Sequence, residues 1–131
     1  MKDVLFLSQK SEPATREDLQ VGTDLRDTLA ANRDRCVGMA ANMIGIKKRV
    51  IIVNIGMADV VMFDPVILSK DSPYEAEEGC LSLTGTRKTT RYENIRVEFY
   101  DMRWKKQQMK LSGWPAQICQ HEMDHLEGIL I

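Results

Sequence analysis

QHEMDHLEGILI, residues 120–131, closes the chain and contains its only two histidines, His121 and His125. Pro115 stands five residues before this stretch, where a helix can begin, because proline's fixed φ and missing N–H donor suit the first helical turn. Apolar residues then recur at helical spacing: Ile118, Met123, Leu126, Ile129 and Leu130. The sequence therefore predicts a C-terminal helix that runs almost to the last residue.

The two histidines are four residues apart, with Glu122 directly after the first. Residues four apart lie on one face of a helix, so both imidazoles can reach a single metal ion. The Glu122 carboxylate can then activate a water molecule at that ion. The alternative is a surface helix with two incidental histidines, but with only two in the chain this pattern arises by accident roughly once in several hundred cases. We favour the metal site.

Two histidines do not complete a catalytic site, because zinc-type centres take three protein ligands and leave a fourth position open. A longer zinc motif places a third histidine three residues after a glycine, and Gly128 is at the right place for that glycine. The position of the histidine is occupied by Ile131. The third ligand must therefore lie upstream, and it is a cysteine or a carboxylate.

Cys80, in the stretch EEGCLS, is the strongest choice for this ligand, because Gly79 lets the backbone approach the site closely. Cys36 and Cys119 are weaker choices. Cys119 lies two residues before His121 on the predicted helix, so it points about 200° away from that histidine.

The bulk composition is that of an ordinary globular protein, and 131 residues fit one domain, residues 1–131. Hydrophobic residues make up 44%, charged residues 28%, and the net charge is −1. We expect no nucleic-acid partner, because no strongly basic surface is indicated. We expect no membrane partner either, because no apolar stretch reaches the roughly 20 residues of a membrane span. Three irregularly spaced cysteines do not form a disulfide framework, which predicts a cytoplasmic location.

The rest of the chain indicates an α+β fold. Residues 15–33 carry apolar residues at helical spacing and predict an amphipathic N-terminal helix. Residues 36–45 are too rich in glycine and alanine to be assigned. Two β-branched runs, 50–53 and 60–63, flank the turn formers Asn54, Gly56 and Asp59, and predict a hairpin or meander.

Further strands are predicted downstream of this hairpin. Residues 65–68 continue in extended form, and 71–73, Asp-Ser-Pro, predict a turn. Residues 91–100 alternate as a strand with Ile95, Val97 and Phe99 on one face, and 109–111 return against it. We expect mainly antiparallel strands packed around the C-terminal helix that carries HExxH, with one N-terminal helix.

Three stretches, GMAANMIG (38–45), EGCLS (78–82) and QHEMDHLEG (120–128), lie in the order and spacing of a known family. Together they resemble the signature motifs of the peptide deformylases. These are metal hydrolases of protein biosynthesis that process the N-terminal methionine of nascent chains by removing its formyl group. The resemblance extends from about the first helix to the C-terminus and implies a single peptide-deformylase-like catalytic domain.

The resemblance implies a role for each residue of the expected metal site. Cys80, His121 and His125 would be the metal ligands, and one Fe2+ or Zn2+ ion per chain suits this mixed thiolate and imidazole set. Glu122 would act as general base and then as general acid. The backbone N–H of Leu81 would help to hold the oxyanion.

The resemblance also implies how a formyl-methionyl peptide would bind. The substrate would pair as an added strand with backbone groups of Val37, Gly38 and Gly79. The methionine side chain would enter a pocket lined by Val37, Glu78, Trp114, Ile118 and His121. Glu78 would also form an ion pair with an arginine, for which Arg91 is the match. Without the resemblance, Trp114 and Ile118 would be interpreted as core residues.

The first motif departs from the family pattern at two positions: Cys36 replaces a glycine and Met43 replaces a glutamine. The family's glutamine donates a hydrogen bond to the formyl oxygen, and a thioether cannot donate. Losing one oxyanion donor typically lowers the rate by about 10² to 10³. Asn42 or a bound water could supply the missing donor. We therefore expect an active peptide deformylase; the alternatives are a non-catalytic or weakly active deformylase-like protein that binds metal or peptide, and a purely structural metal site.

Many bacterial members of the family dock on the ribosome through a C-terminal extension. Here the sequence ends at Ile131, directly after the predicted helix. The nascent peptide is therefore the expected partner, and ribosome docking by that route is not expected.

Overall fold

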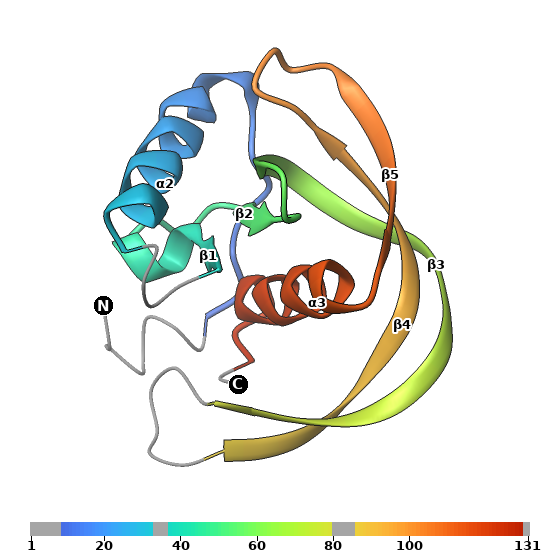
Figure 1. The fold of residues 1–131 in the computed structure, drawn as a ribbon. Helices are drawn as coiled ribbons and strands as arrows, with labels where there is room; N and C mark the ends of the chain where they lie inside the picture. Colours follow the sequence, from blue (N-terminus) through green and yellow to red (C-terminus); the bar gives the residue numbers. More distant parts are fainter. Residues whose placement is uncertain (1–8, 33–36, 80–85, 130–131) are drawn as a thin grey trace.

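The computed structural model describes residues 9–32, 37–79 and 86–129, which form a five-stranded antiparallel sheet and two α-helices (Figure 1). This confirms the predicted α+β class. The elements, in chain order, are η1 (Arg16–Asp18), α2 (Leu19–Ala31), β1 (Gly38–Ala40), η2 (Ala41–Ile44), β2 (Val50–Asn54), β3 (Asp59–Gly79), β4 (Thr86–Tyr100), β5 (Lys106–Ser112) and α3 (Trp114–Leu126). No helix in these three ranges is both long enough and apolar enough to cross a lipid bilayer.

The predicted hairpin is confirmed as β2 paired with β3, in a register that runs from Val50 opposite Phe63 to Asn54 opposite Asp59. Its turn is closed by Asn54, whose side-chain amide donates to Asp59 Oδ1 at 2.8 Å. Asn54 Oδ1 accepts from the N–H of Gly56 at 2.9 Å. Gly56 has φ +100°, a left-handed conformation that glycine adopts without a steric penalty.

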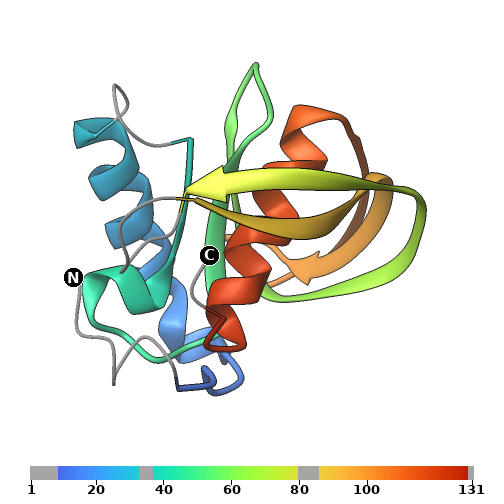
Figure 2. The ribbon, with the colours of Figure 1, turned by 90° about the horizontal axis from the view of Figure 1, so that it is seen from below.

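Strand β2 is buried on both sides and lies between the two helices (Figure 2). Val50 and Ile52 pack into the core that α2 covers, whereas Ile51 and Val53 pack into the core that α3 covers. Successive side chains of a strand point to opposite faces, so one strand serves both cores. This explains why the run VIIV is apolar without alternation.

The turn predicted at residues 71–73 is wrong, because β3 continues through them to Gly79. Asp71 pairs with Asn94 of β4 and Pro73 pairs with Tyr92, so the register is the same before and after Ser72. Ser72 has φ +57°, so the local turn tendency is visible as one left-handed residue. Long-range pairing with β4 overrides the local turn signal.

Strands β3, β4 and β5 curve around α3, which lies in the hollow of the sheet (Figure 1). The predicted inward face of β4 is confirmed: Ile95, Val97 and Phe99 are buried. They form one hydrophobic core with Ile118, Cys119 and Leu126 of α3. This packing fixes α3 against the sheet, and the neighbouring helix face, which carries Ile118 and Glu122, lies against β1.

Helix α3 begins at Trp114 with Pro115 in its first turn, as predicted, but it ends at Leu126 and not near residue 130. Gly128 has φ +77°, and its N–H donates to the carbonyl of His125 at 3.1 Å. The N–H of Ile129 donates to the carbonyl of Asp124 at 3.0 Å. These two bonds form a Schellman motif, which ends a helix at a left-handed glycine.

Gly22 in α2 marks the closest approach of that helix to β3. A Cβ at this position would lie 2.6 Å from Phe63 Cζ, 2.7 Å from Met102 Sδ and 2.9 Å from Val61 Cγ1. Phe63 is fully buried and cannot move aside, although the Met102 side chain can. The glycine therefore allows α2 to sit directly on β3.

We expect Gly22→Ala to destabilise the protein by up to about 2 kcal/mol, because overpacking the core costs about 1 to 3 kcal/mol and the gain in helix propensity returns only about 1 kcal/mol. Urea unfolding followed by circular dichroism measures this difference. The matched control is Asp27→Ala at an exposed position of α2, where the helix propensity gain meets no close contact and stability should not fall. A Gly22→Ala protein as stable as the wild type would contradict the close packing.

Candidate metal centre

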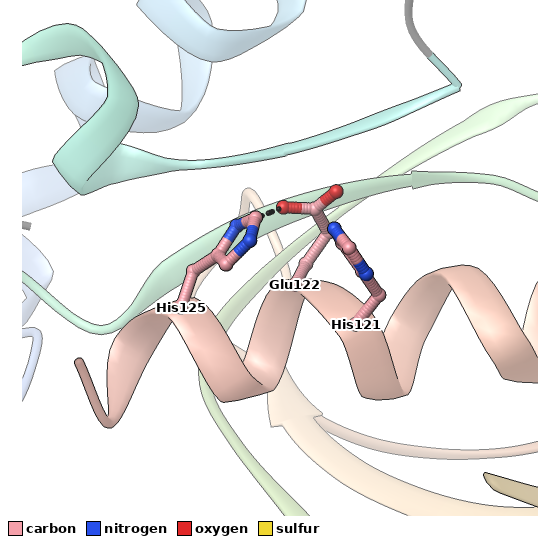
Figure 3. Close-up of side chains that lie close together, drawn as sticks. All are labelled: His121, Glu122 and His125. Atoms are coloured by element: carbon pink, nitrogen blue, oxygen red, sulfur yellow. Dashed lines mark hydrogen bonds and ion pairs between the residues drawn. The ribbon is translucent and has the colours of Figure 1, made fainter. Parts of the chain in front are cut away.

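His121, Glu122 and His125 lie together on α3, each offering one ligand atom, and these atoms are all within 4.8 Å of one another (Figure 3). The two imidazole rings have centroids 4.6 Å apart and cross at 73°. Glu122 and His125 are buried, whereas His121 is partly exposed. The arrangement predicted from the HExxH spacing is thus present, and its imidazole and carboxylate donors suit Zn2+ or Fe2+.

The Glu122 side chain points from α3 toward β1. Its Oε1 is 3.1 Å from His125 Nδ1, the contact drawn in Figure 3. Its Oε2 would be 3.2 Å from a Cβ at Gly38, and Ile118 Cγ2 would be only 2.6 Å from that Cβ. Only glycine fits where β1 passes over Ile118 and Glu122, which gives Gly38 a steric reason to be in the site.

Glu78, near the end of β3, is the polar centre of the site. Its Oε1 lies 2.7 Å from His121 Nδ1 and accepts from Arg91 Nη2 at 2.6 Å. Its Oε2 accepts from Arg91 Nε and from Gln117 Nε2, both at 2.9 Å. The expected ion pair between Glu78 and Arg91 is confirmed, and it is bidentate, the geometry in which a guanidinium fits a carboxylate best.

The charge state of Glu78 follows from these contacts. Burial by itself raises the pKa of Glu78, but hydrogen bonds from His121, Arg91 and Gln117 lower this pKa well below its usual range. An ionised carboxylate only accepts, so His121 Nδ1 must carry the proton that it donates. The other ring nitrogen, Nε2, is then the one that can offer a lone pair to a metal ion.

Arg91 is itself buried and joins three elements. Besides its two bonds to Glu78, its Nη1 donates to Asp124 Oδ2 on α3 at 2.6 Å. Burial lowers the pKa of Arg91, but hydrogen bonds to Glu78 and Asp124 outweigh this and raise it. The sequence interpretation missed Asp124, although it stands within the HEMDH motif three residues after His121, on the same side of the helix.

Gln117 and Tyr74 are two further residues that the sequence interpretation missed. Gln117 stands one helical turn before His121 and donates to Glu78, and Tyr74 Oη donates to Gln117 Oε1 at 3.1 Å. The helical spacing of 117 and 121 was a usable signal, but nothing local marks Tyr74, which reaches the site only through the fold of β3.

Strand β1 forms one end of the sheet order in the described part of the chain and pairs only with β2. The N–H of Asn54 donates to the carbonyl of Val37 at 2.9 Å, so this pair is hydrogen-bonded. Bonded and non-bonded pairs alternate along an antiparallel ladder, so the next pair, Gly38 with Val53, is of the non-bonded kind. The N–H and C=O of Gly38 therefore point away from β2, toward the edge of β1 with which no described strand pairs, and Val37 beside it is exposed.

Met43 and Asn42 lie in η2, directly after β1. The N–H of Ala40 donates to Met43 Sδ at 3.3 Å, so the thioether acts as an acceptor. Asn42 is 1% exposed, and its side-chain amide donates to the carbonyl of His125 at 2.8 Å. This contact ties η2 to the end of α3 and engages one of the two N–H groups of the Asn42 amide.

Two of the expected pocket residues, Ile118 and Trp114, differ in solvent exposure. Ile118 is 4% exposed and packs in the core beneath Gly38, whereas Trp114 is 58% exposed at the start of α3. The core interpretation therefore holds for Ile118 and fails for Trp114. Both residues share a helix face with His121 through their spacing. Gly79 ends β3, and Cys36, Cys80 and Leu81 lie outside the described residues.

The structure rules out Cys119 as the third metal ligand, because its side chain is buried in the hydrophobic core. It is fully buried in the core between α3 and the sheet. Burial raises the pKa of its thiol to about 12, and the negative charge of Glu122 adds to this.

We expect iodoacetamide at pH 8 to leave Cys119 unmodified in the native protein, because the thiol is inaccessible and only about one in ten thousand molecules would carry the thiolate. Peptide mapping by mass spectrometry measures the modification. The same treatment in guanidinium chloride is the control and should alkylate Cys119 completely. Similar rates in both conditions would contradict its place in the core.

The fold and the site together define a metal-dependent hydrolase of the HExxH type, built on an antiparallel sheet that curves around its metal-binding helix. Comparison with known proteins gives the family. The sequence matches the profile "Polypeptide deformylase" over residues 3–131. The chain belongs to the peptide deformylase family.

Individual relatives agree with this assignment. A peptide deformylase of Clostridium beijerinckii is 56% identical over 131 residues, which cover 100% of this chain and 96% of that protein. One from Heliobacterium modesticaldum is 36% identical, covering 95% of this chain and 83% of the relative.

Solved structures of the family also superpose closely on this fold. The crystal structure of peptide deformylase from Thermus thermophilus aligns with a TM-score of 0.84 at 32% identity, over 99% of this chain and 80% of that one. The actinonin-bound class I type b enzyme from Acinetobacter baumannii aligns with a TM-score of 0.82 at 34% identity, over 95% and 88% of the two chains.

Proposed function

We propose that this peptide deformylase removes the N-formyl group from formyl-methionyl peptides of nascent proteins and releases formate. The observation that carries the proposal is the cluster of His121, Glu122 and His125, with His121 held by Glu78. The 56% identity to a peptide deformylase over the whole chain supports an active enzyme and not the non-catalytic or weakly active alternative. A closed structural site would not need the buried carboxylate of Glu122.

The metal set of this proposal is Cys80, His121 and His125, with one Fe2+ or Zn2+ ion. The two imidazoles fit such an ion, because their ligand atoms lie within 4.8 Å of each other and of the Glu122 carboxylate. Glu78 lies against His121, and Cys80 follows Glu78 by two residues in the sequence. When bound, the ion supplies Lewis acidity for the formyl oxygen and lowers the pKa of a water molecule.

Glu122 is the proposed general base and acid. Its carboxylate is buried beside both histidines, so it can take a proton from the attacking water and deliver it to the leaving amine. The N–H of Leu81 is the proposed backbone donor to the oxyanion.

The peptide is proposed to bind as a strand at the open edge of β1. The outward N–H and C=O of Gly38, beside the exposed Val37, would pair with the substrate backbone, and Gly79 would pair from the other side. The methionine side chain would lie near Glu78, Trp114, Ile118 and His121. Because the substrate is the nascent chain, we place the enzyme in the cytoplasm.

We expect Glu122→Ala to lower formate release from a formyl-Met peptide by about 10² to 10⁴, because it removes general acid–base catalysis. Metal content should persist, since both histidines remain. A coupled formate assay with metal analysis measures both quantities. Glu127→Gln is the matched control, because this carboxylate at the end of α3 is exposed and pairs only with Arg49 among the described residues. Wild-type protein loaded with Fe2+ under anaerobic conditions that releases no formate would contradict the proposal.

Met43→Gln tests the variant first motif. A glutamine can still accept from the N–H of Ala40 through its oxygen while its amide donates to the formyl oxygen. We expect kcat to rise, by up to about 10² to 10³ if a full oxyanion donor is restored. Met43→Leu, which neither accepts nor donates, is the control and should show no rise. A Met43→Gln enzyme no faster than the wild type, at equal metal content, would show that no oxyanion donor is missing from the site.

A further inference from the structure

We propose that Gln117 and Tyr74 are positioning residues that hold the Glu78 carboxylate against His121 and thereby slow the release of the metal ion from His121. This inference deepens the proposed function and rests on it. Neither residue belongs to the expected ligand, base or pocket set. Both act through Glu78, because Tyr74 donates to Gln117 and Gln117 donates to the Glu78 carboxylate.

The Glu78 carboxylate contacts two side chains on the same face of α3, His121 and Gln117. One oxygen, Oε1, faces His121 at 2.7 Å, and the other, Oε2, accepts from Gln117 at 2.9 Å. Gln117 and His121 are one turn apart on α3, so these two contacts fix the carboxylate relative to the helix axis at two points. Among the described residues, removing Gln117 leaves His121 as the one α3 side chain that contacts the carboxylate directly.

Arg91 anchors the same carboxylate, but from a different element. It approaches from β4 and is also bound to Asp124. Arg91 therefore links Glu78 to α3 only indirectly, through Asp124, whereas Gln117 on α3 bonds the carboxylate itself. The orientation of the His121 ring depends on the position of the carboxylate relative to α3, because the ring is carried by α3.

Tyr74 fixes which way the Gln117 amide faces. Tyr74 and Glu78 are four residues apart on β3, and Tyr74 Oη donates to Gln117 Oε1 at 3.1 Å. Burial and the charges of Glu93 and Glu78 raise the pKa of Tyr74, so its phenol stays protonated and donates. With Oε1 engaged in this way, Nε2 is the end of the amide that meets the ionised Glu78.

The hydrogen bonds therefore have one consistent direction. Tyr74 donates to Gln117, Gln117 donates to Glu78, and His121 Nδ1 donates to Glu78 from the other side. This direction keeps the His121 lone pair on Nε2, the nitrogen that a metal ion needs. A group that bonds a metal-ligating histidine directly, as Glu78 would, typically changes metal affinity by about 10- to 100-fold, and Gln117 and Tyr74 act on His121 through that group.

The competing explanation is that Gln117 only ties α3 to β3. Gln120 provides the matched control, because it stands on the same helix and beside His121, yet within the described ranges its amide bonds only backbone groups. Its Oε1 accepts from the N–H of Tyr92 at 2.9 Å, and its Nε2 donates to the carbonyls of Tyr92 and Ala116. Gln120→Leu thus loosens the packing of α3 without touching Glu78.

The experiment measures the rate at which Zn2+-loaded protein releases its ion to an excess of a chromophoric chelator. We expect Gln117→Leu to release Zn2+ about 10-fold faster than the wild type. Tyr74→Phe, which keeps the ring and removes only the hydroxyl, should release it about threefold faster. Gln120→Leu should lower the melting temperature of the metal-free protein while releasing Zn2+ at the wild-type rate.

Wild-type release rates in Gln117→Leu and Tyr74→Phe would overturn the inference. Equal acceleration in Gln120→Leu and Gln117→Leu would overturn it as well, since loosened packing would then be sufficient. If Gln120→Leu does not fold, Tyr74→Phe decides alone. Formate release by the wild type is assayed separately: a wild type without turnover contradicts the proposed function, whereas a wild type with turnover and unchanged variant release rates contradicts only this inference.

Discussion

The buried carboxylate of Glu78 is the interaction on which the arrangement of the site depends. A carboxylate at such a buried position costs several kcal/mol unless it is paired and hydrogen-bonded. Its hydrogen-bond partners come from β4 and α3, so the carboxylate is fully hydrogen-bonded only when β3, β4 and α3 are packed in their native positions. The same condition orients His121, and folding and metal binding are therefore coupled through one side chain.

The two hydrophobic cores hold the helices and strands that carry these residues in place. Strand β2 is buried on both faces, which places α2 and α3 on opposite sides of it and leaves β1 beside α3. Gly38 then allows β1 to pass close over Ile118 and Glu122. The proposed base is consequently buried, while the outward backbone groups of Gly38 remain at an open edge where a peptide strand can pair.

Met43 and Asn42 hold the segment after β1 in place although the first motif has methionine where the family has glutamine. Met43 accepts a hydrogen bond from the N–H of Ala40, so it closes the turn between β1 and η2 even though it cannot donate. Asn42 fastens that turn to the carbonyl of His125. The loop beside the histidines is therefore held by one local contact and one long-range contact, and neither requires a glutamine at position 43.

Local chemistry in the sequence determined the α+β class, the hairpin of β2 and β3, the buried face of β4 and the HExxH cluster, because periodicity, turn residues and helical spacing act over a few residues. Gly128 is a helix stop signal that indicated the end of α3, but the prediction extended the helix past it because apolar residues continue at helical spacing. Only the tertiary structure decided that β3 continues through Asp71 and Pro73, that Asn42 faces His125, and that Tyr74, Gln117 and Asp124 join the site. These outcomes depend on pairing and packing between residues far apart in the chain, and long-range contacts can override any local preference.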